Sequence, residues 1–409
     1  MLDRLWAGFF LVAFGAAVFQ SLALGRPGVW ADMVGAAFES ARTAFEIALG
    51  LTGVMCLWLG VMKIGERGGA VDLLARAFGP LLARLFPSIP SGHPATGSIV
   101  MNMAANMLGL DNAATPLGLK AMKELQALNP DPETATDDQI LFLVLNTSAV
   151  TVIPVAIFTY RATLGAADPT DVFLPLLIAT TCSTLAGLVV TAAVQRLRLA
   201  DPVVLAYLGG LVAIVGGLAA WFARLDREAV ERHSSLIGNF LIFGVIIAFM
   251  VLGLRRHIPL YETFVDGAKE GFGVAVGIIP YLVAMLVAIG ILRASGSLDL
   301  VLDAARWAVG GLGLDARWVD GLPTALVRPL SGAGARGMMI ETMKTHGADS
   351  FAGRLVCVIQ GSTETTLYVL AVYFGAVGVR RTRHAVGCGL AADLAGFLGA
   401  VLVTYLFFA

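Results

Sequence analysis

Two acidic residues lie inside apolar segments that are long enough to cross a membrane. Glu364 sits within IQGSTETTLYVL and Asp393 sits within CGLAADLAGFLG. A carboxylate at bilayer depth costs about 2.5–3.5 kcal/mol or more, so it usually faces a cavity or a partner. We therefore interpret both residues as candidates for binding a coupling cation or a proton, with Glu364 also facing a solute. The alternative is a structural ion pair with Arg328 or Arg336.

Two segments rich in glycine and proline offer a second kind of chemistry. They are PSIPSGHPATGS and RPLSGAGARG. Helices that begin there expose unpaired N–H groups and a positive dipole end, which suit anionic or carbonyl groups. The candidate substrate-binding residues are Ser91, Gly92, His93, Thr96, Ser98, Ser331, Gly332 and Gly334. His93 is also open to a purely structural role beside Pro94.

Polar residues on the neighbouring apolar runs complete the candidate site. Asn102 and Asn106 are four residues apart, so on a helix they share one face. Further along the chain, the residues expected to face the two breaks are Asn146, Gln360, Ser362 and Thr363. Interhelical hydrogen bonding is the alternative use of such residues in a membrane protein.

The sequence offers no pattern for catalysis, a metal or a cofactor. The four cysteines lie far apart inside apolar runs. GAGARG at 332–337 matches a dinucleotide fingerprint, but it lacks the preceding strand that the fingerprint requires. No G-x-S-x-G or H-E-x-x-H is present. We therefore expect no enzyme, no bound metal and no cofactor. A net charge of -1 without a charged tail argues against nucleic acid as a partner.

The elements that position these residues must be membrane helices. Hydrophobic residues make up 57% of the 409 residues and charged residues only 14%, whereas a soluble protein carries about 25% charge. In lipid, every backbone polar group must be satisfied internally, which favours helices. About nine full spans are predicted at 5–24, 44–62, 139–160, 172–195, 203–222, 236–254, 272–293, 352–376 and 385–408.

Two regions, 66–128 and 294–350, do not fit a simple span. Each begins with an amphipathic stretch and continues into one of the segments rich in glycine and proline. Irregular backbone at membrane depth is tolerated only inside protein or beside a cavity. We interpret both regions as re-entrant helix–break–helix hairpins whose breaks meet at the midplane. The polar stretch 113–138 is interpreted as a cytoplasmic helix and loop.

Short matches in the same order suggest two related halves, 1–200 and 201–409. The pairs are 91–92 with 331–332, 146–148 with 360–362, and 184–187 with 393–396. Loops with paired arginines at 196–198, 255–256 and 380–383 are expected in the cytoplasm. Two spans and a hairpin separate the last two loops, so the second hairpin enters from outside and the first from the cytoplasm. The repeat is therefore predicted to be inverted.

Long blocks of the chain resemble a known family. The block from PSIPSGHPATGS to FLVLNTSAVTVIP resembles spore maturation protein A. The block from RPLSGAGARGMM to RRTRHAVGCGL resembles spore maturation protein B. The chain is thus similar to the two proteins fused head to tail, and both belong to the nucleoside recognition, or gate, domain family. The resemblance implies kinship with segments of ferrous iron permeases and of concentrative nucleoside transporters.

These observations predict an all-α polytopic protein of the bacterial inner membrane, with two hairpins in an inverted repeat. Discontinuous helices that meet near the midplane are typical of secondary transporters. We expect an ion-coupled permease for a small polar solute, nucleoside-like or other. The alternatives are a membrane scaffold in envelope or spore maturation, and a passive channel. The expected partners are the lipid bilayer, the solute, a cation or proton, and a second copy of the chain in a homodimer.

Overall fold

The fold is built from helices throughout the part of the chain that the structure describes. This computed structural model describes residues 2–90, 92–108, 111–148, 150–152, 154–197, 199–222, 224–225 and 227–409. Within these residues it contains no strand, and eight segments are long and apolar enough to cross a membrane. The predicted all-α, polytopic class is therefore confirmed.

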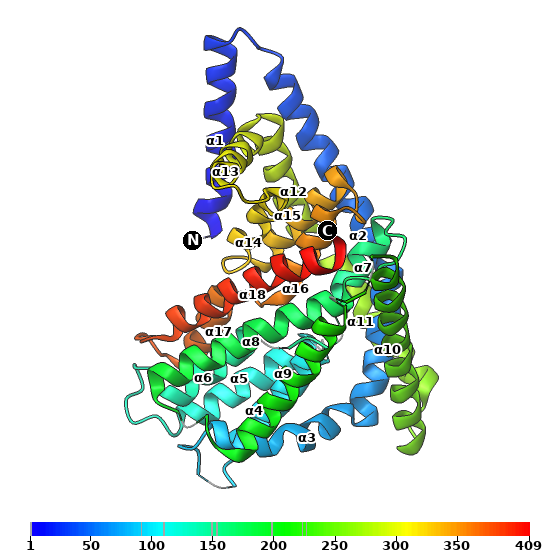
Figure 1. Cartoon of the computed structure of the whole chain (residues 1–409), viewed down its shortest axis with the longest axis vertical. Coiled ribbons are helices and arrows are strands. Elements are labelled where there is room, and N and C mark those ends of the chain that lie inside the picture. Colours follow the sequence, from blue (N-terminus) through cyan, green and yellow to red (C-terminus); the bar gives the residue numbers. More distant parts are fainter. Residues whose placement is uncertain are drawn as a thin grey trace.

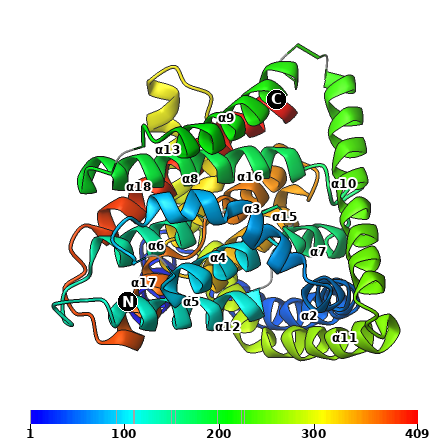
Figure 2. The same cartoon turned by 90° about the horizontal axis from the view of Figure 1, so that it is seen from below.

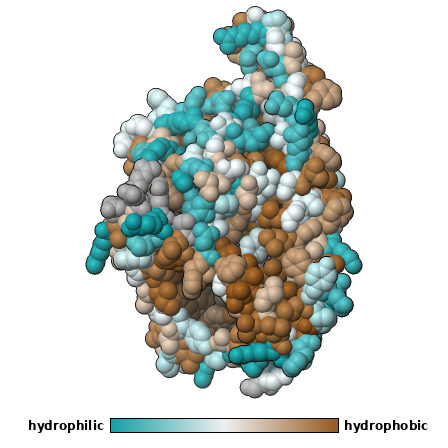
Figure 3. All heavy atoms as spheres, turned by 90° about the vertical axis from the view of Figure 1, so that its right-hand side faces the viewer, coloured by the Kyte–Doolittle hydropathy of each residue, from teal (hydrophilic) through white to brown (hydrophobic). Residues whose placement is uncertain are grey.

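Most of the spans are continuous helices. Large apolar side chains are exposed along them, for example Leu11 in the helix 2–23 and Phe240 in the helix 227–255. Figure 3 shows such residues covering much of the lower part of one face, as expected of a surface that contacts lipid. The continuous spanning helices are α1 (Leu2–Ala23), α2 (Val29–Gly68), α8 (Phe173–Gln195), α9 (Pro202–Phe222), α10 (Arg227–Arg255) and α18 (Ala385–Phe408). The consecutive helices α11 (Leu260–Gly277) and α12 (Ile279–Ala294) together form one further span.

Two predicted spans are broken helices instead. The run 139–160 consists of α6 (Asp137–Thr147) and α7 (Val155–Thr163), so the prediction of nine full spans was wrong there. The run 352–376 consists of α16 (Phe351–Ser362) and α17 (Thr366–Val377), although its total length still qualifies it as a span. The first interruption ends at Pro154, which lacks an N–H group. The second contains hydroxyl side chains that compete with helical hydrogen bonds.

Both hairpin regions contain a helix, an irregular turn and a further helix. The first contains α3 (Ala70–Leu85), α4 (Pro94–Met107) and α5 (Asp111–Gln126). The second contains α13 (Ser297–Gly311), η1 (Arg317–Gly321), α14 (Leu322–Val327) and α15 (Gly332–His346). Helix α5 was expected to be a separate cytoplasmic helix, but it packs against α4 and α17. Its residues Ala121, Met122 and Leu125 are buried in a shared core, because their spacing gives the helix one apolar face.

Helices α8 and α18 pack side by side and cross the middle of the molecule diagonally (Figure 1). One apolar core joins the N-terminal end of α8 and the C-terminal end of α18 to α7 and α16. A second core joins the C-terminal part of α8 and the N-terminal end of α18 to α4, α5, α6 and α17. Each broken helix therefore contributes one half to each core, and the two breaks fall between the cores. Figure 2 shows α10 and α11 at the edge of the molecule.

Candidate functional site

The two breaks meet each other. The backbone N–H of Glu364, in the second break, donates to the carbonyl of Thr147 at the end of α6 over 2.7 Å. Each break is also tied to its own half. Val152 donates through its N–H to Met107 at the end of α4, and Leu367 donates to Pro329 before α15, both over 2.9 Å. Backbone groups freed by the breaks are thus satisfied inside the protein, as membrane depth requires.

Glycines let α8 and α18 approach the breaks closely. A Cβ atom added at Gly396 would lie 2.7 Å from Thr363 Cγ2, and one added at Gly389 would lie 2.6 Å from Thr366 Cγ2. On α8, a Cβ atom at Gly187 would lie 3.3 Å from the Ser148 hydroxyl. Contacts below 3.4 Å leave no room for a side chain, so these glycines fix how near the crossing helices come.

The matching residues of the two halves serve matching breaks. The hydroxyl of Thr184, on α8, donates to the carbonyl of Ser148 in the first break. Asp393, on α18, accepts a hydrogen bond over 2.9 Å from the hydroxyl of Thr366, directly after the second break. The sequence matches 184–187 and 393–396 therefore occupy corresponding places in space.

Asp393 is the buried acid of the site. Its side chain is 8% exposed, and Oδ1 accepts from Thr366. Among the described residues, Oδ2 has no hydrogen-bond partner. The side-chain oxygen of Gln360, in the last turn of α16, is likewise buried without a partner there. Such acceptors carry a desolvation penalty until a donor arrives, so both mark this half as receptive to a ligand or a proton.

Glu364 has a different environment from Asp393. Its side chain is 52% exposed, and its carboxylate lies 3.5 Å from the guanidinium of Arg328. That guanidinium also donates from Nε to the carbonyl of Thr363 over 2.9 Å. The ion pair with Arg328 that the sequence left open is thus present. Arg336 instead donates to the carbonyl of Gly332.

Three asparagines form a chain of amides in the first half. Asn106 Nδ2 donates to Asn146 Oδ1 over 2.8 Å, and Asn102 Nδ2 donates to the carbonyl of Ala114 over 2.7 Å. Asn146 Nδ2 in turn donates to the carbonyl of Phe142. Asn102 and Asn146 are buried, whereas Asn106 is only partly buried. Asn106 is therefore the most exposed of the three amides.

The structure separates the first hairpin turn from the breaks. His93 caps α4 by accepting on Nδ1 from the N–H of Ala95, and Asn106 follows thirteen positions after His93 in the sequence. At a rise of 1.5 Å per residue, this is about 20 Å along the helix. The two hairpin turns therefore do not meet, contrary to expectation, because the breaks of α6 and α16 occupy the centre instead. The residues placed at the far end of α4 are Gly92, His93, Thr96 and Ser98; Ser91 lies outside the described residues.

The second hairpin turn does lie beside a break. Ser331 caps α15 by accepting from the N–H of Gly334 over 3.0 Å. A Cβ atom at Gly332 would lie 2.7 Å from the hydroxyl of Thr365, in the second break. Gly334 packs against other side chains, since a Cβ atom there would lie 2.8 Å from Val327. Of the predicted hairpin residues, Ser331 and Gly332 therefore adjoin the second break most closely. Ser362, at the end of α16, donates within its own helix to Ile359.

A buried ionic network joins the halves at one end of the molecule, and the sequence analysis did not identify it. Arg161, at the end of α7, is 0% exposed and lies 2.8 Å from Asp171 and 3.0 Å from Asp349. Arg161 also donates to the carbonyl of Ala348, and Arg354 pairs with Asp171. An arginine directly after an apolar run, with aspartates in the next loop, was the available signal.

An exposed set of ion pairs joins the halves at the opposite end. The loop before α18 pairs Arg381 with Asp131, at 3.1 Å, and Arg383 with Asp137, at 2.8 Å. The backbone N–H of Ala135 also donates to the carbonyl of Arg381. The two junctions thus use the same chemistry at very different degrees of burial.

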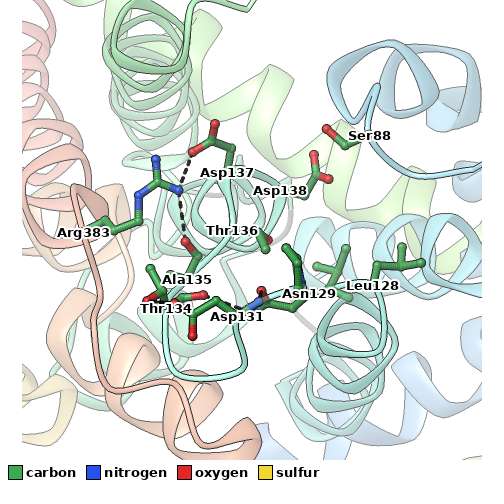
Figure 4. Close-up of a pocket in the computed structure, with 12 residues that line it drawn as sticks. Ser88, Leu128, Asn129, Asp131, Thr134, Ala135, Thr136, Asp137, Asp138 and Arg383 are labelled. Carbon is green, nitrogen blue, oxygen red and sulfur yellow. Dashed lines mark hydrogen bonds and ion pairs between the residues drawn. The ribbon is translucent and has the colours of Figure 1, made fainter.

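A pocket of about 380 Å³ opens at this exposed junction, between the α5–α6 loop, the turn before α4 and Arg383 (Figure 4). In this view the carboxyl of Asp138 points toward Ser88, while Asp137 turns toward Arg383. Burial, with the neighbouring charge of Asp137, raises the pKa of Asp138 to about 6. The pocket is remote from the breaks, because α6 begins at the pocket and runs away from it to the first break.

Replacing Asp138 by asparagine is expected to flatten the dependence of stability on pH. The folded protein holds this proton more tightly than the unfolded chain, in which the pKa of the carboxyl group is near 3.8. The stability that the protonated carboxyl group contributes is therefore fully present below about pH 3.8 and is lost as the pH rises through about 6. After allowance for solvent screening, the effect is about 1–2 kcal/mol. Melting temperatures measured across this range should fall with pH in the parent and not in Asp138→Asn.

Asp131→Asn is the matched control for this prediction. A hydrogen bond from Thr134 holds the pKa of Asp131 below its usual value, so its removal should not flatten the same slope. An unchanged slope in Asp138→Asn would show that another group titrates in this range.

Comparison with known proteins places both halves in one family. The family model for nucleoside recognition, named Gate, matches residues 48–164 and 275–380, which together exceed half of the chain. Spore maturation protein B of Bacillus subtilis (strain 168) is 47% identical over 164 residues, covering 40% of this chain and 90% of that protein. Spore maturation protein A of the same organism is 40% identical over 163 residues, covering 40% and 83%. No solved structure matches the chain.

Proposed function

Because this chain belongs to the nucleoside recognition family and to the group of spore maturation proteins A and B, we propose that it is a permease. It would carry a small polar solute across the bacterial inner membrane through the crossing of its two broken helices. The observation that supports this most is the hydrogen bond between the breaks, from Glu364 to Thr147. Irregular backbone at membrane depth is stable only inside protein or beside a cavity, and transporters place their sites there.

The polar groups around the crossing divide into two sets. The first half offers neutral amides, of which Asn106 is the accessible one. The second half offers the carboxyl of Asp393 and the amide oxygen of Gln360, each with an unpartnered buried oxygen among the described residues. In this proposal the solute binds to the amides and the coupling ion binds in the second half. An ion gradient would supply the energy, and rocking of one half against the other would alternate access.

Thermal stability against a panel of solutes tests the proposed function. A ligand that binds only the folded protein raises the melting temperature by mass action. The panel contains nucleosides, nucleobases, amino acids, small carboxylates and metal ions, each in sodium and in potassium buffer. We expect one class to raise the melting temperature, and Asn106→Ala to abolish that shift. Asn129→Ala, in the remote pocket of Figure 4, should retain it.

The names of the relatives support a second candidate function. Both are spore maturation proteins, so the chain would hold partners in a maturing envelope without transporting anything. That role would be favoured if no member of the panel changed the melting temperature and proteoliposomes took up none of these solutes. A shift that survives Asn106→Ala but is lost in Asn129→Ala would move the binding site to the remote pocket.

A further inference from the structure

The environment of Asp393 is suited to a neutral carboxyl group. It is buried against α17, and the Thr366 hydroxyl donates a hydrogen bond to its Oδ1. Its other oxygen has no partner among the described residues. A buried carboxylate with an unsatisfied oxygen costs several kcal/mol, whereas the protonated form avoids most of that cost. Such a group gains a proton readily and releases it when its surroundings become polar.

The charged groups that act on Asp393 are Arg328 and Glu364, from the neighbouring turn and break. These two lie 3.5 Å apart and largely offset each other. Helix α8, which packs against α18 most extensively, carries no acidic or basic residue along Phe173–Gln195. Helix α8 carries Cys182 as its titratable side chain. On the other helices packed against α18, the titratable side chains that the structure describes are Asp137 and Asp138 on α6, Arg354 and Cys357 on α16, Tyr368 and Tyr373 on α17, and Arg232, His233 and Arg255 on α10.

A metal cation is poorly served at this place. Divalent cations such as calcium take about six or more oxygen ligands, usually including several carboxylates. No group of three or more histidine, cysteine or acidic residues in the described part of the chain could hold one. The fixed positive charge of Arg328 would also repel a metal cation bound beside Thr363, whose carbonyl it already contacts. A proton needs only one oxygen and leaves no net charge behind.

We propose that the coupling ion is a proton carried by the carboxyl group of Asp393, and that Glu364 with Arg328 forms a fixed charge pair. This inference rests on the proposed function. The carboxylate of Asp393 takes one proton from the aqueous side to which the crossing is open, giving a neutral acid. When access switches, the same O–H bond breaks and the proton leaves to the other side. Glu364, already neutralised and half exposed, does not take part in this cycle.

Infrared difference spectroscopy of the purified protein, between mildly acidic and alkaline buffer, tests the inference without a known solute. We expect a carbonyl stretch of a protonated carboxylic acid that disappears in Asp393→Asn. The band should persist in Glu364→Gln, the matched control, and should be the same in sodium and in potassium. Thr366→Val removes the hydrogen bond to Oδ1, so it should shift the band without removing it. That shift assigns the band to Asp393 even if Asp393→Asn folds poorly.

The outcomes separate this inference from the proposed function. A band unchanged in both Asp393→Asn and Thr366→Val, or one that responds to sodium, overturns the proton assignment even when a solute shift is found. With a solute identified by the panel, proteoliposomes provide a second test. Asp393→Asn should lose uptake driven by a pH gradient and keep exchange of internal for external solute. Uptake driven by a pH gradient that survives this substitution would refute the role of Asp393 while leaving the permease intact.

Discussion

Replacing Arg161 by glutamine is expected to lower the free energy of unfolding by about 3–5 kcal/mol. The guanidinium is fully buried and satisfies Asp171, Asp349 and the carbonyl of Ala348 at once. Its removal leaves carboxylate and carbonyl oxygens that the shorter side chain cannot reach. Asp171 retains Arg354 and Asp349 retains the N–H of Ala167, so each carboxylate keeps one donor and loses the guanidinium. The melting temperature in detergent and the yield of folded protein should both fall sharply.

Arg381→Gln provides the comparison at the other junction. That pair, with Asp131, has side chains 63% and 54% exposed, and such pairs contribute about 0–1 kcal/mol. The same change of residue type should therefore have a small effect there, and added salt should reduce it further. Equal losses from the two substitutions would show that burial does not decide the strength of the junctions.

Replacing Gly396 by alanine is expected to abolish solute binding with a loss of about 1–3 kcal/mol in stability. The new Cβ atom would lie 2.7 Å from Thr363 Cγ2 and 3.2 Å from Ser183 Cβ. Either α18 moves outward or the second break moves, and both changes displace the groups at the crossing. The solute-dependent shift in melting temperature and the uptake by proteoliposomes measure the two consequences.

Gly387→Ala, on the same helix, is the matched control. A Cβ atom there meets nothing within 4 Å. Alanine favours a helix over glycine by about 1 kcal/mol, so this variant should be neutral or slightly more stable. If Gly396→Ala behaves like Gly387→Ala, the close packing of α18 against the break does not limit function.

The class of fold and the acids of the site were predictable from the sequence because their signals are local. A run such as 385–408 is apolar enough to identify a membrane helix by itself. Glu364 and Asp393 stood out because a charge is rare in such a run. What the sequence did not distinguish is their environment. Only the structure shows that Glu364 faces Arg328 and that Asp393 lacks a second partner among the described residues.

The interruptions of α6 and α16 were not predicted, since they depend on tertiary contacts. The segments 139–160 and 352–376 are mainly apolar, and nothing local marks Thr363–Thr365 as non-helical except hydroxyl side chains. The freed backbone groups find partners in distant segments, such as Thr147 for Glu364. Because glycine and proline mark the first hairpin turn clearly in the sequence, the turn was predicted to lie at the centre of the site, whereas the structure places it at the far end of α4.

The length of α2 ties the protein to the thickness of its bilayer. Its 40 residues make a rod of about 60 Å, twice the hydrocarbon thickness of about 30 Å. Average helix tilts of about 20° cannot absorb that difference. Part of α2 must therefore extend beyond the hydrocarbon layer, and the exposed pair of Arg42 and Glu46 suits the part that reaches water. Because α2 packs on α12 near Ser40 and on α11 near Leu59, hydrophobic mismatch along α2 is transmitted to the second half. In the proposed permease, acyl chain length should therefore bias which side of the membrane the site between the two breaks faces.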